Sequence, residues 1–283
     1  MPRLRDAQTE RLLSGHLWLQ EWIDGRRCRF RMQESGVLEV SDGEHVFRQS
    51  DVPPALQAPI RHLRERIDRD ALRMAVDDVE AVVFLGVATV RNRIAYEWDR
   101  IPLFLGYDVW LVDESRFLPP DRVEAIYEGL GLTPINAFRK EVRAVDFDPD
   151  DHEFPDSKWY SGPVAGTVVR NKTGDRALLS NRAVGGEESS DAMAASSGPD
   201  ELGSTPEPAE LAGEVTTDRR IDRARERIET SGGRSTPEAL VERVLEGIYR
   251  EEAHLIDHLE EDDRRAFRTA VAAAVRRSLA ESE

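Results

Sequence analysis

The sequence predicts an α+β fold of antiparallel sheets and helices, followed by a small helical region at the C-terminus. Two stretches with strand-like apolar patterns are separated by a segment with helical periodicity, and the last third of the chain is again helical in pattern. Strands and helices that do not alternate regularly favour an α+β fold over a parallel α/β sheet.

The first strand-forming region covers residues 17–48. Apolar side chains such as Leu17, Leu19 and Phe30 recur in it, and turn sequences at Asp24-Gly25 and at residues 34–36 interrupt it. This pattern predicts a meander of short strands.

The middle of the chain predicts helices and strands in turn. Residues 56–76 have a helical period, and residues 79–90 form a β-branched run that is typical of a buried strand. Another strand is expected at residues 107–112, and Pro120 favours the start of a short helix. Residues 163–180 are expected to form a hairpin.

The C-terminal part changes character. Residues 184–217 are acidic and poor in apolar side chains, which predicts a disordered linker or insertion. Residues 218–283 are expected to form a helical domain, in which Pro237 occupies a typical first helical position. The predicted organisation is therefore residues 1–183 as the first domain, 184–217 as the linker and 218–283 as the helical domain.

Composition restricts the class of protein. The 283 residues have a formal net charge of −16, and Lys140, Lys158 and Lys172 are the only lysines. An acidic, lysine-poor surface is typical of a high-salt cytoplasm, where salt screens the repulsion between carboxylates.

Cys28 is the only cysteine, which excludes an internal disulfide. No apolar run is long enough for a membrane span and no signal peptide is evident, so a cytoplasmic location is expected.

Several short motifs follow one another along the chain in an order that is found in a known protein family. They are Trp22-Ile23-Asp24-Gly25, Phe84-Leu85-Gly86-Val87, Tyr107-Asp108 on an apolar strand, Ala165-Gly166-Thr167-Val168 and Ala177-Leu178-Leu179. In this order and spacing they resemble the motifs of the ATP-dependent RNA ligases, in the covalent nucleotidyltransferase superfamily. The resemblance implies a nucleotidyltransferase (ATP-grasp-like ligase) domain, with two antiparallel sheets flanking a nucleotide cleft.

The sequence differs from the family pattern at the positions that carry the catalytic and metal-binding groups. The resemblance places Trp22 at the nucleophilic lysine, Val87 and Ala165 at two glutamates, and Leu178 at a lysine that neutralises phosphate charge. Indole cannot attack phosphorus, and hydrocarbon side chains hold neither ribose hydroxyls nor a metal ion. We therefore expect no catalytic residue and no metal site, and we expect a pocket repacked as core.

Other residues keep groups suited to nucleotide or RNA binding. The candidates are Trp22, Asp24, Arg27, Tyr107, Asp108, Arg170 and Arg176. Aromatic rings can stack on bases, and arginines can hold phosphates. Each candidate also has a structural interpretation: Trp22 as a filler of the unused pocket, Asp24 as a turn residue, Tyr107 as core, and the arginines as solvated surface.

The sequence predicts a catalytically inactive RNA-ligase-like protein that binds RNA ends, a nucleotide or a partner protein. One alternative is an active ligase with an atypical nucleophile. Lys158, which lies beside Trp159 and shortly before the motif that begins at Ala165, is the only lysine that the sequence suggests for this role. ATP and Mg²⁺ are expected as cofactors only in that case. Another alternative is a structural subunit of an active paralogue.

Overall fold

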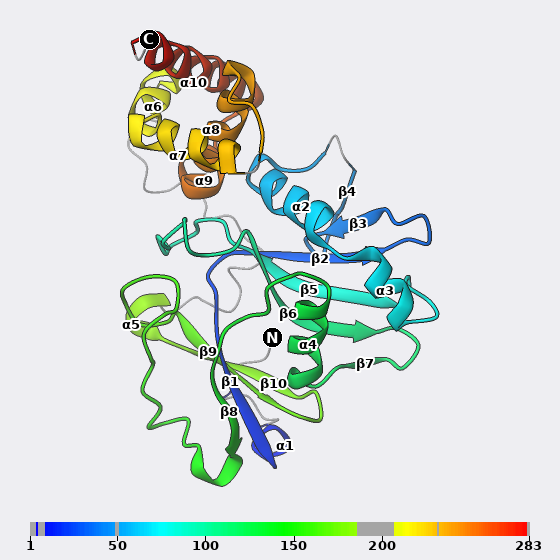
Figure 1. The fold of residues 1–283 in the computed structure, drawn as a ribbon. Coiled ribbons are helices and arrows are strands. Elements are labelled where there is room, and N and C mark those ends of the chain that lie inside the picture. The colour runs from blue at the N-terminus through cyan, green and yellow to red at the C-terminus, as the bar shows by residue number, and fades with distance from the viewer. Residues whose placement is uncertain (1–3, 5–8, 49–50, 186–206, 231, 282–283) are drawn as a thin grey trace. The chain divides into compact units, whose positions relative to one another are not determined.

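The computed structural model describes residues 4, 9–48, 51–185, 207–230 and 232–281. Contacts divide the chain into two compact units, Met1–Val52 with Pro59–Ser197 and Pro53–Ala58 with Gly198–Glu283. The first unit contains both sheets and the second contains the C-terminal helices (Figure 1). This arrangement confirms the predicted α+β fold with a C-terminal helical region.

The first sheet has four antiparallel strands in the order β10-β9-β1-β8. Its strands are β1 (His16–Glu21), β8 (Ala137–Arg143), β9 (Gly166–Asn171) and β10 (Arg176–Ser180). The hairpin expected at residues 163–180 is confirmed as β9 and β10, whereas β8 was not anticipated. Helix α1 (Thr9–Leu12) precedes this sheet, and α5 (Arg182–Gly185) follows it.

The second sheet has six antiparallel strands in the order β4-β3-β2-β5-β6-β7. They are β2 (Arg26–Met32), β3 (Leu38–Ser41), β4 (Val46–Phe47), β5 (Val82–Ala88), β6 (Phe104–Leu111) and β7 (Arg116–Phe117). The meander predicted for residues 17–48 is therefore wrong in one respect. Its first strand, β1, belongs to the other sheet, and the chain changes sheets at residues 22–25.

Helices accompany the second sheet. The period at residues 56–76 divides into α2 (Pro54–Arg66) and α3 (Arg69–Ala75), because the side chain of Asp68 accepts hydrogen bonds from the amides of Asp70 and Ala71 and caps a new helix. Helix α4 (Pro120–Gly129) contacts β6 and starts where Pro120 predicted. The hydroxyl of Tyr127 donates to the carbonyls of Leu85 and Asp108, which fixes α4 to β5 and β6. A short 3₁₀ helix, η1 (Ala144–Asp146), follows β8.

The helical unit contains α6 (Pro208–Val215), α7 (Asp218–Thr230), α8 (Pro237–Glu251), α9 (Ala253–Ile256) and α10 (Glu261–Glu281). Helix α6 corrects the predicted linker of residues 184–217. Its Leu211, Ala212 and Val215 are buried in the apolar core that α7, α8 and α10 share. Residues 186–206 of the predicted linker lie outside the described part of the chain. No helix in the described residues is long and apolar enough to cross a membrane.

Candidate functional site

A cavity in the first unit is lined by residues of both sheets and of the segment that joins them. Its total empty volume is about 440 Å³ with the open mouth included. The lining residues are Gln20, Trp22, Ile23, Gly25, Arg27, Val87, Tyr107, Asp108, Ile135, Val168, Arg170 and Arg176. Six of the seven binding candidates therefore meet in one place, and Asp24 is the exception.

The pleat of the first sheet explains which residues reach the cavity. Residues directly opposite each other on antiparallel strands project from the same face. Val168 on β9 is opposite Gln20 on β1 and Leu178 on β10, and Arg170 is opposite Arg176. The same face therefore presents Gln20, Val168 and both arginines to the cavity, while the opposite face of these strands contributes to a separate apolar cluster that includes Leu19, Val169 and Ala177.

A β-bulge in the second sheet brings two consecutive residues to the cavity. Gly86 is opposite Gly106 and Leu85 is opposite Asp108, so Tyr107 is the extra residue of strand β6. A regular strand would direct Tyr107 and Asp108 to opposite faces, whereas a bulge re-aims one of them. Both side chains consequently line the cavity.

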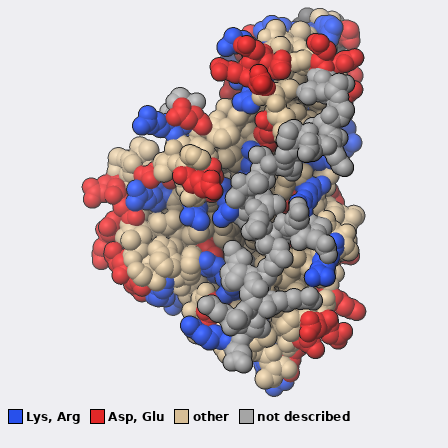
Figure 2. Space-filling view, turned by 180° about the vertical axis from the view of Figure 1, so that it is seen from behind, with Lys and Arg blue, Asp and Glu red and all other residues tan. Residues whose placement is uncertain are grey.

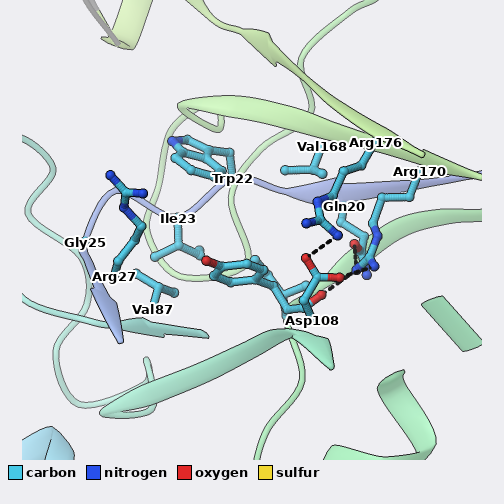
Figure 3. Close-up of a pocket in the computed structure, with 12 residues that line it drawn as sticks. Gln20, Trp22, Ile23, Gly25, Arg27, Val87, Asp108, Val168, Arg170 and Arg176 are labelled. Atoms are coloured by element: carbon cyan, nitrogen blue, oxygen red, sulfur yellow. Dashed lines mark hydrogen bonds and ion pairs between the residues drawn. The ribbon is translucent and has the colours of Figure 1, made fainter. Parts of the chain in front are cut away.

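Asp108 forms the centre of a buried ionic cluster. Its side chain is fully buried, and its Oδ1 pairs with Nη2 of Arg170, which is 2% exposed. Its Oδ2 lies 2.8 Å from Nη1 of Arg176, which is 16% exposed. Nη1 of Arg170 also donates to the Tyr107 carbonyl and to Oε1 of Gln20, so this guanidinium is held in a fixed position (Figure 3).

Burial and charge act against each other in this cluster. Burial raises the pKa of the Asp108 carboxyl, and the charges of Arg170 and Arg176 oppose that shift. Burial also lowers the pKa of Arg176, while the Asp108 carboxylate raises it. A guanidinium group keeps its proton in proteins, so the cluster has two positive charges around one carboxylate.

The lining of the cavity has the opposite charge to the chain as a whole. It contains three arginines and one aspartate, a formal net charge of +2, in a chain whose net charge is −16. Figure 3 shows Arg27 on one side of the cavity and the Asp108 cluster on the other, with Trp22 and Ile23 between them. The remaining lining is mainly aliphatic, and its aromatic side chains are Trp22 and Tyr107.

Three positions where the family resemblance expects charged groups are buried among apolar side chains. Val87 and Ala165 are 6% and 8% exposed, and both belong to an apolar cluster with Ile23, Ile135 and Trp159. Leu178 is 5% exposed and is opposite Val168. Trp22 is only partly buried and packs against the same cluster as Val87. Ala165 and Leu178 are not among the residues that line the cavity.

Asp24 is the binding candidate that does not line the cavity, and its hydrogen bonds are those of the structural turn residue that was its other interpretation. Its Oδ1 accepts a hydrogen bond from the side chain of Asn92, and its Oδ2 accepts from the backbone amides of Arg93 and Ile94 at 2.7 and 3.0 Å. Its own amide donates to the hydroxyl of Tyr96. These hydrogen bonds of Asp24 therefore join the loop after β5 to the segment after β1.

The structure also places residues that the motifs did not identify. Buried Glu21, at the end of β1, accepts hydrogen bonds from Ser157, the Lys158 amide and Asn136, and burial raises the pKa of its carboxyl. Gln20 and Ile135 line the cavity without belonging to any recognised motif. Only the alternation along β1 could have indicated Gln20, since it is two residues before Trp22 on the same face.

The three lysines all lie in the described part of the chain, and none lines the cavity. Nζ of Lys140 pairs with Glu124, and Nζ of Lys172 pairs with Glu141. Nζ of Lys158 lies 4.9 Å from the centre of the Trp159 ring on an exposed side chain.

The cavity residues do not fit a divalent metal ion. Such ions prefer several oxygen ligands, and both oxygens of Asp108, the only carboxylate in the lining, already face guanidinium groups. Val87 and Ala165 offer no oxygen in their side chains. Within the described residues there is also no group of three or more His, Cys, Asp and Glu side chains that could hold a metal.

No protein-family model and no curated protein matches this chain. Among solved structures, the chain is similar to RNA ligases. One is the Naegleria gruberi RNA ligase with PPi, at 11% identity and a TM-score of 0.48 over 64% of this chain and 55% of that chain. Another is an archaeal ATP-dependent RNA ligase, at 15% identity and a TM-score of 0.44 over 99% of this chain and 63% of that chain. The chain thus spans little more than half of the Naegleria protein.

Proposed function

We propose that this protein is an RNA-ligase-like protein that binds a nucleotide or an RNA end in the cavity and does not transfer AMP. The observation that supports this most directly is the formal charge of +2 on the cavity lining, in a chain of net charge −16. A locally positive cavity in an acidic protein favours an anionic ligand.

The lining offers groups that suit both parts of a nucleotide. Guanidinium groups form charge-assisted hydrogen bonds with phosphate oxygens, and here Arg170 and Arg176 are held in place by Asp108. The rings of Tyr107 and Trp22 provide surfaces on which a base can stack. Stacking tolerates different bases, so this lining does not select one base by itself.

The same cavity lacks the groups that adenylyl transfer needs. In that reaction an amine forms a bond to the α-phosphorus of ATP, pyrophosphate leaves with the bonding electrons, and the amine loses a proton. The nitrogen lone pair of Trp22 is part of the indole π-system, and none of the three lysines lines the cavity. Lys158, the strongest substitute by sequence, has an exposed side chain whose amine lies over the Trp159 ring.

The decisive test is to incubate the protein with α-labelled ATP and Mg²⁺ or Mn²⁺ and to analyse it on a denaturing gel. An active RNA ligase treated in parallel serves as the positive control. We expect no covalent label on this protein and reversible binding of AMP or short RNA in a parallel titration. A labelled residue identified by mass spectrometry would support the active-ligase alternative, and failure to bind any nucleotide or RNA would favour a structural subunit of an active paralogue.

A further inference from the structure

The face of the second sheet that lines the cavity continues beyond the cavity. Residues opposite each other on antiparallel strands project from the same face, so the strand register defines rows across the sheet. The first row pairs Arg27 with Val87, and both residues line the cavity. The next row, two residues further along each strand, pairs Arg29 with Leu85, and Leu85 is opposite Asp108. The rows therefore lead from the cavity along the sheet.

A third row lies outside the cavity. By the same alternation Arg31 on β2 and Val83 on β5 follow, and Val83 is opposite Trp110 on β6. The side chain of Arg31 is 45% exposed, and Val83 and Trp110 are partly exposed. The reverse face of these strands is closed, because Phe30 and Phe84 are buried there and Phe84 packs against a tyrosine of α4. Of the two faces, the one with the arginines is accessible to a ligand.

Strand β2 has an arginine at every second position on this face. Arg27, Arg29 and Arg31 are spaced by about 7 Å, the length of two residues in an extended strand. An extended single strand of nucleic acid has one negative charge per nucleotide at a similar spacing, so a ladder of this kind suits its backbone. Nε of Arg29 is buried without a hydrogen bond in the described residues, and an unsatisfied donor is costly unless a ligand or water supplies the acceptor.

Trp110 supplies a surface on which a base can stack. Its ring lies 4.6 Å from the ring of Phe117 on β7, measured between centres. The guanidinium of Arg176 already lies over the Phe117 ring at 3.5 Å, so a base is expected to stack on Trp110. Trp110 and Arg31 are two strands apart, which is about 10 Å. One nucleotide can therefore place its phosphate at Arg31 and its base on Trp110.

From this arrangement we propose that the open face of the second sheet binds a single RNA strand that leaves the cavity. The strand contacts Arg29, Arg31 and Trp110, which we call the sheet track, and about two nucleotides lie there beyond the one in the cavity. The even spacing of the charges favours a polynucleotide over an acidic peptide, whose carboxylates are not held at one fixed interval. This inference rests on the proposed function and extends it from the end of the strand to the nucleotides that follow.

The first experiment is a calorimetric titration of the full-length protein with 5′-phosphorylated oligouridylates of two, four and eight nucleotides. We expect the affinity to rise by at least about tenfold from two to four nucleotides and by less than about twofold from four to eight, because the track is then full. Each phosphate held in a single strand adds about 0.7 to the slope of log affinity against log salt. The tetranucleotide should therefore have a slope about 1.4 steeper than the dinucleotide.

Glu39 gives a test that misfolding cannot imitate. It is opposite Arg31 on β3, and both of its oxygens accept from Nη2 of Arg31, at 3.1 and 3.2 Å. Its carboxylate repels a phosphate at Arg31, while a guanidinium has further N–H groups to donate. We expect Glu39→Gln to bind the tetranucleotide about threefold or more tightly than the parent does, with the dinucleotide unchanged within about twofold.

Two further variants remove the contacts themselves. Arg31→Gln and Trp110→Ala are each expected to weaken binding of the tetranucleotide by about fivefold or more, and to leave the dinucleotide within about twofold of the parent. The matched control is Arg116→Gln. Arg116 is as exposed as Arg31 and also pairs with a glutamate, Glu114, but it is opposite Leu111 and next to Phe117, so it projects from the other face of the sheet. If Trp110→Ala does not fold, as judged by circular dichroism, Arg31→Gln and Glu39→Gln decide the matter.

The outcomes separate this inference from the proposed function. If the dinucleotide binds and longer strands bind no better, the sheet track is wrong and the proposed function stands. Unchanged affinity of the tetranucleotide for Arg31→Gln and Glu39→Gln would also overturn the track, because the strand would then follow another path. A glutamate-rich peptide of equal charge that displaces the tetranucleotide at the same concentration would show that the face binds acidic chains in general. If no nucleotide or oligonucleotide binds at all, both proposals are wrong.

Discussion

Val87 lies in an apolar cluster at 6% exposure, at the position where the family resemblance expects a glutamate. A carboxylate placed there would lose hydration without gaining a metal ion or a cationic partner. We expect Val87→Glu to lower the free energy of unfolding by about 1–3 kcal/mol. Chemical denaturation measures this value directly.

Val112 provides the matched control for this prediction. It is also a valine, directly after strand β6 of the same sheet, but it is 45% exposed. Val112→Glu is expected to change the free energy of unfolding by no more than about 0.5 kcal/mol. Equal losses in the two variants would show that the site of Val87 can accept a carboxylate and that the cavity has not been repacked.

Glu21 is expected to make stability depend on pH. Burial raises the pKa of its carboxyl above the ordinary value of 4.5, although hydrogen bonds from Ser157 and Asn136 oppose this shift. Because the folded state favours the protonated form, the stabilisation by Glu21 is fully present below pH 4.5 and is lost as the pH rises through the folded pKa. The unfolding free energy of the parent relative to Glu21→Gln should therefore be largest at low pH and fall toward neutrality.

This comparison needs denaturation curves at several pH values for both proteins, since the chain has many other carboxyl groups. The exposed Glu44, changed to Gln in a third protein, controls for the general effect of removing one negative charge. A difference that increases with pH would mean that the hydrogen bonds to Glu21 outweigh its burial.

At the scale of elements, strand β6 passes so close to helix α4 that one residue has no room for a side chain. A Cβ added to Gly106 would lie 2.2 Å from the ring of Tyr127, which is fully buried. We expect Gly106→Ala to lower the free energy of unfolding by about 1–3 kcal/mol. The same Tyr127 also donates to the Asp108 carbonyl, so this substitution is also expected to disturb the cavity.

Gly129 is the control for that prediction. It is the last residue of α4, and a Cβ added there would meet nothing within 4 Å. Gly129→Ala is expected to leave the protein as stable as the parent or to stabilise it by up to about 1 kcal/mol. If Gly106→Ala proved equally harmless, the close contact between β6 and α4 would not exist in solution.

Helix α6 is a second test at this scale. Leu211 is 2% exposed in the core of the helical unit, so Leu211→Ala is expected to destabilise that unit by about 2–4 kcal/mol. The adjacent Glu210 is exposed, and Glu210→Ala should change stability by no more than about 0.5 kcal/mol. Thermal unfolding followed by circular dichroism compares the two, and equal behaviour would restore the original linker interpretation.

Local patterns predicted the elements better than their partners. Alternation and periodicity located β5, β6, α4 and the β9–β10 hairpin, because each depends on neighbouring residues in the chain. The assignment of β1 to a different sheet from β2 depends on long-range pairing with β8 and β9, which no local pattern encodes. Helix α6 was missed because its acidic, proline-containing surroundings hide three buried apolar residues.

For the candidate site too, the sequence predicted the individual residues better than the contacts between distant parts of the chain. The motif residues Trp22, Tyr107, Asp108, Arg170 and Arg176 were identified from the sequence, and they do meet in one cavity. What the sequence could not indicate is that Asp108 is shared by both arginines, since that pairing joins strands of different sheets. The sequence could not decide between the two interpretations of Asp24, because a carboxylate in a turn looks the same whether it faces a ligand or caps a loop.

At the scale of the whole molecule, charge is distributed in two opposing ways. The chain has 55 Asp and Glu residues against 39 Lys and Arg. Figure 2 shows acidic side chains gathered in several groups on one face, with basic side chains scattered between them. The lining of the cavity reverses this balance with a formal charge of +2. Salt therefore acts on stability and on ligand binding through different groups.

We expect these two properties to respond to salt in opposite directions. Raising KCl screens the mutual repulsion of the acidic surface, so the melting temperature should rise by about 5 °C or more, which is equivalent to about 1–2 kcal/mol in a chain of this size. The same ions compete with a bound phosphate, so the affinity for AMP or for a 5′-phosphorylated oligoribonucleotide should fall over the same titration. Thermal unfolding and calorimetric binding, measured in the same series of KCl concentrations, give both values. If affinity and stability rose together, the ligand would be held mainly by stacking and burial against Trp22, Tyr107 and the aliphatic wall, and not by the arginines.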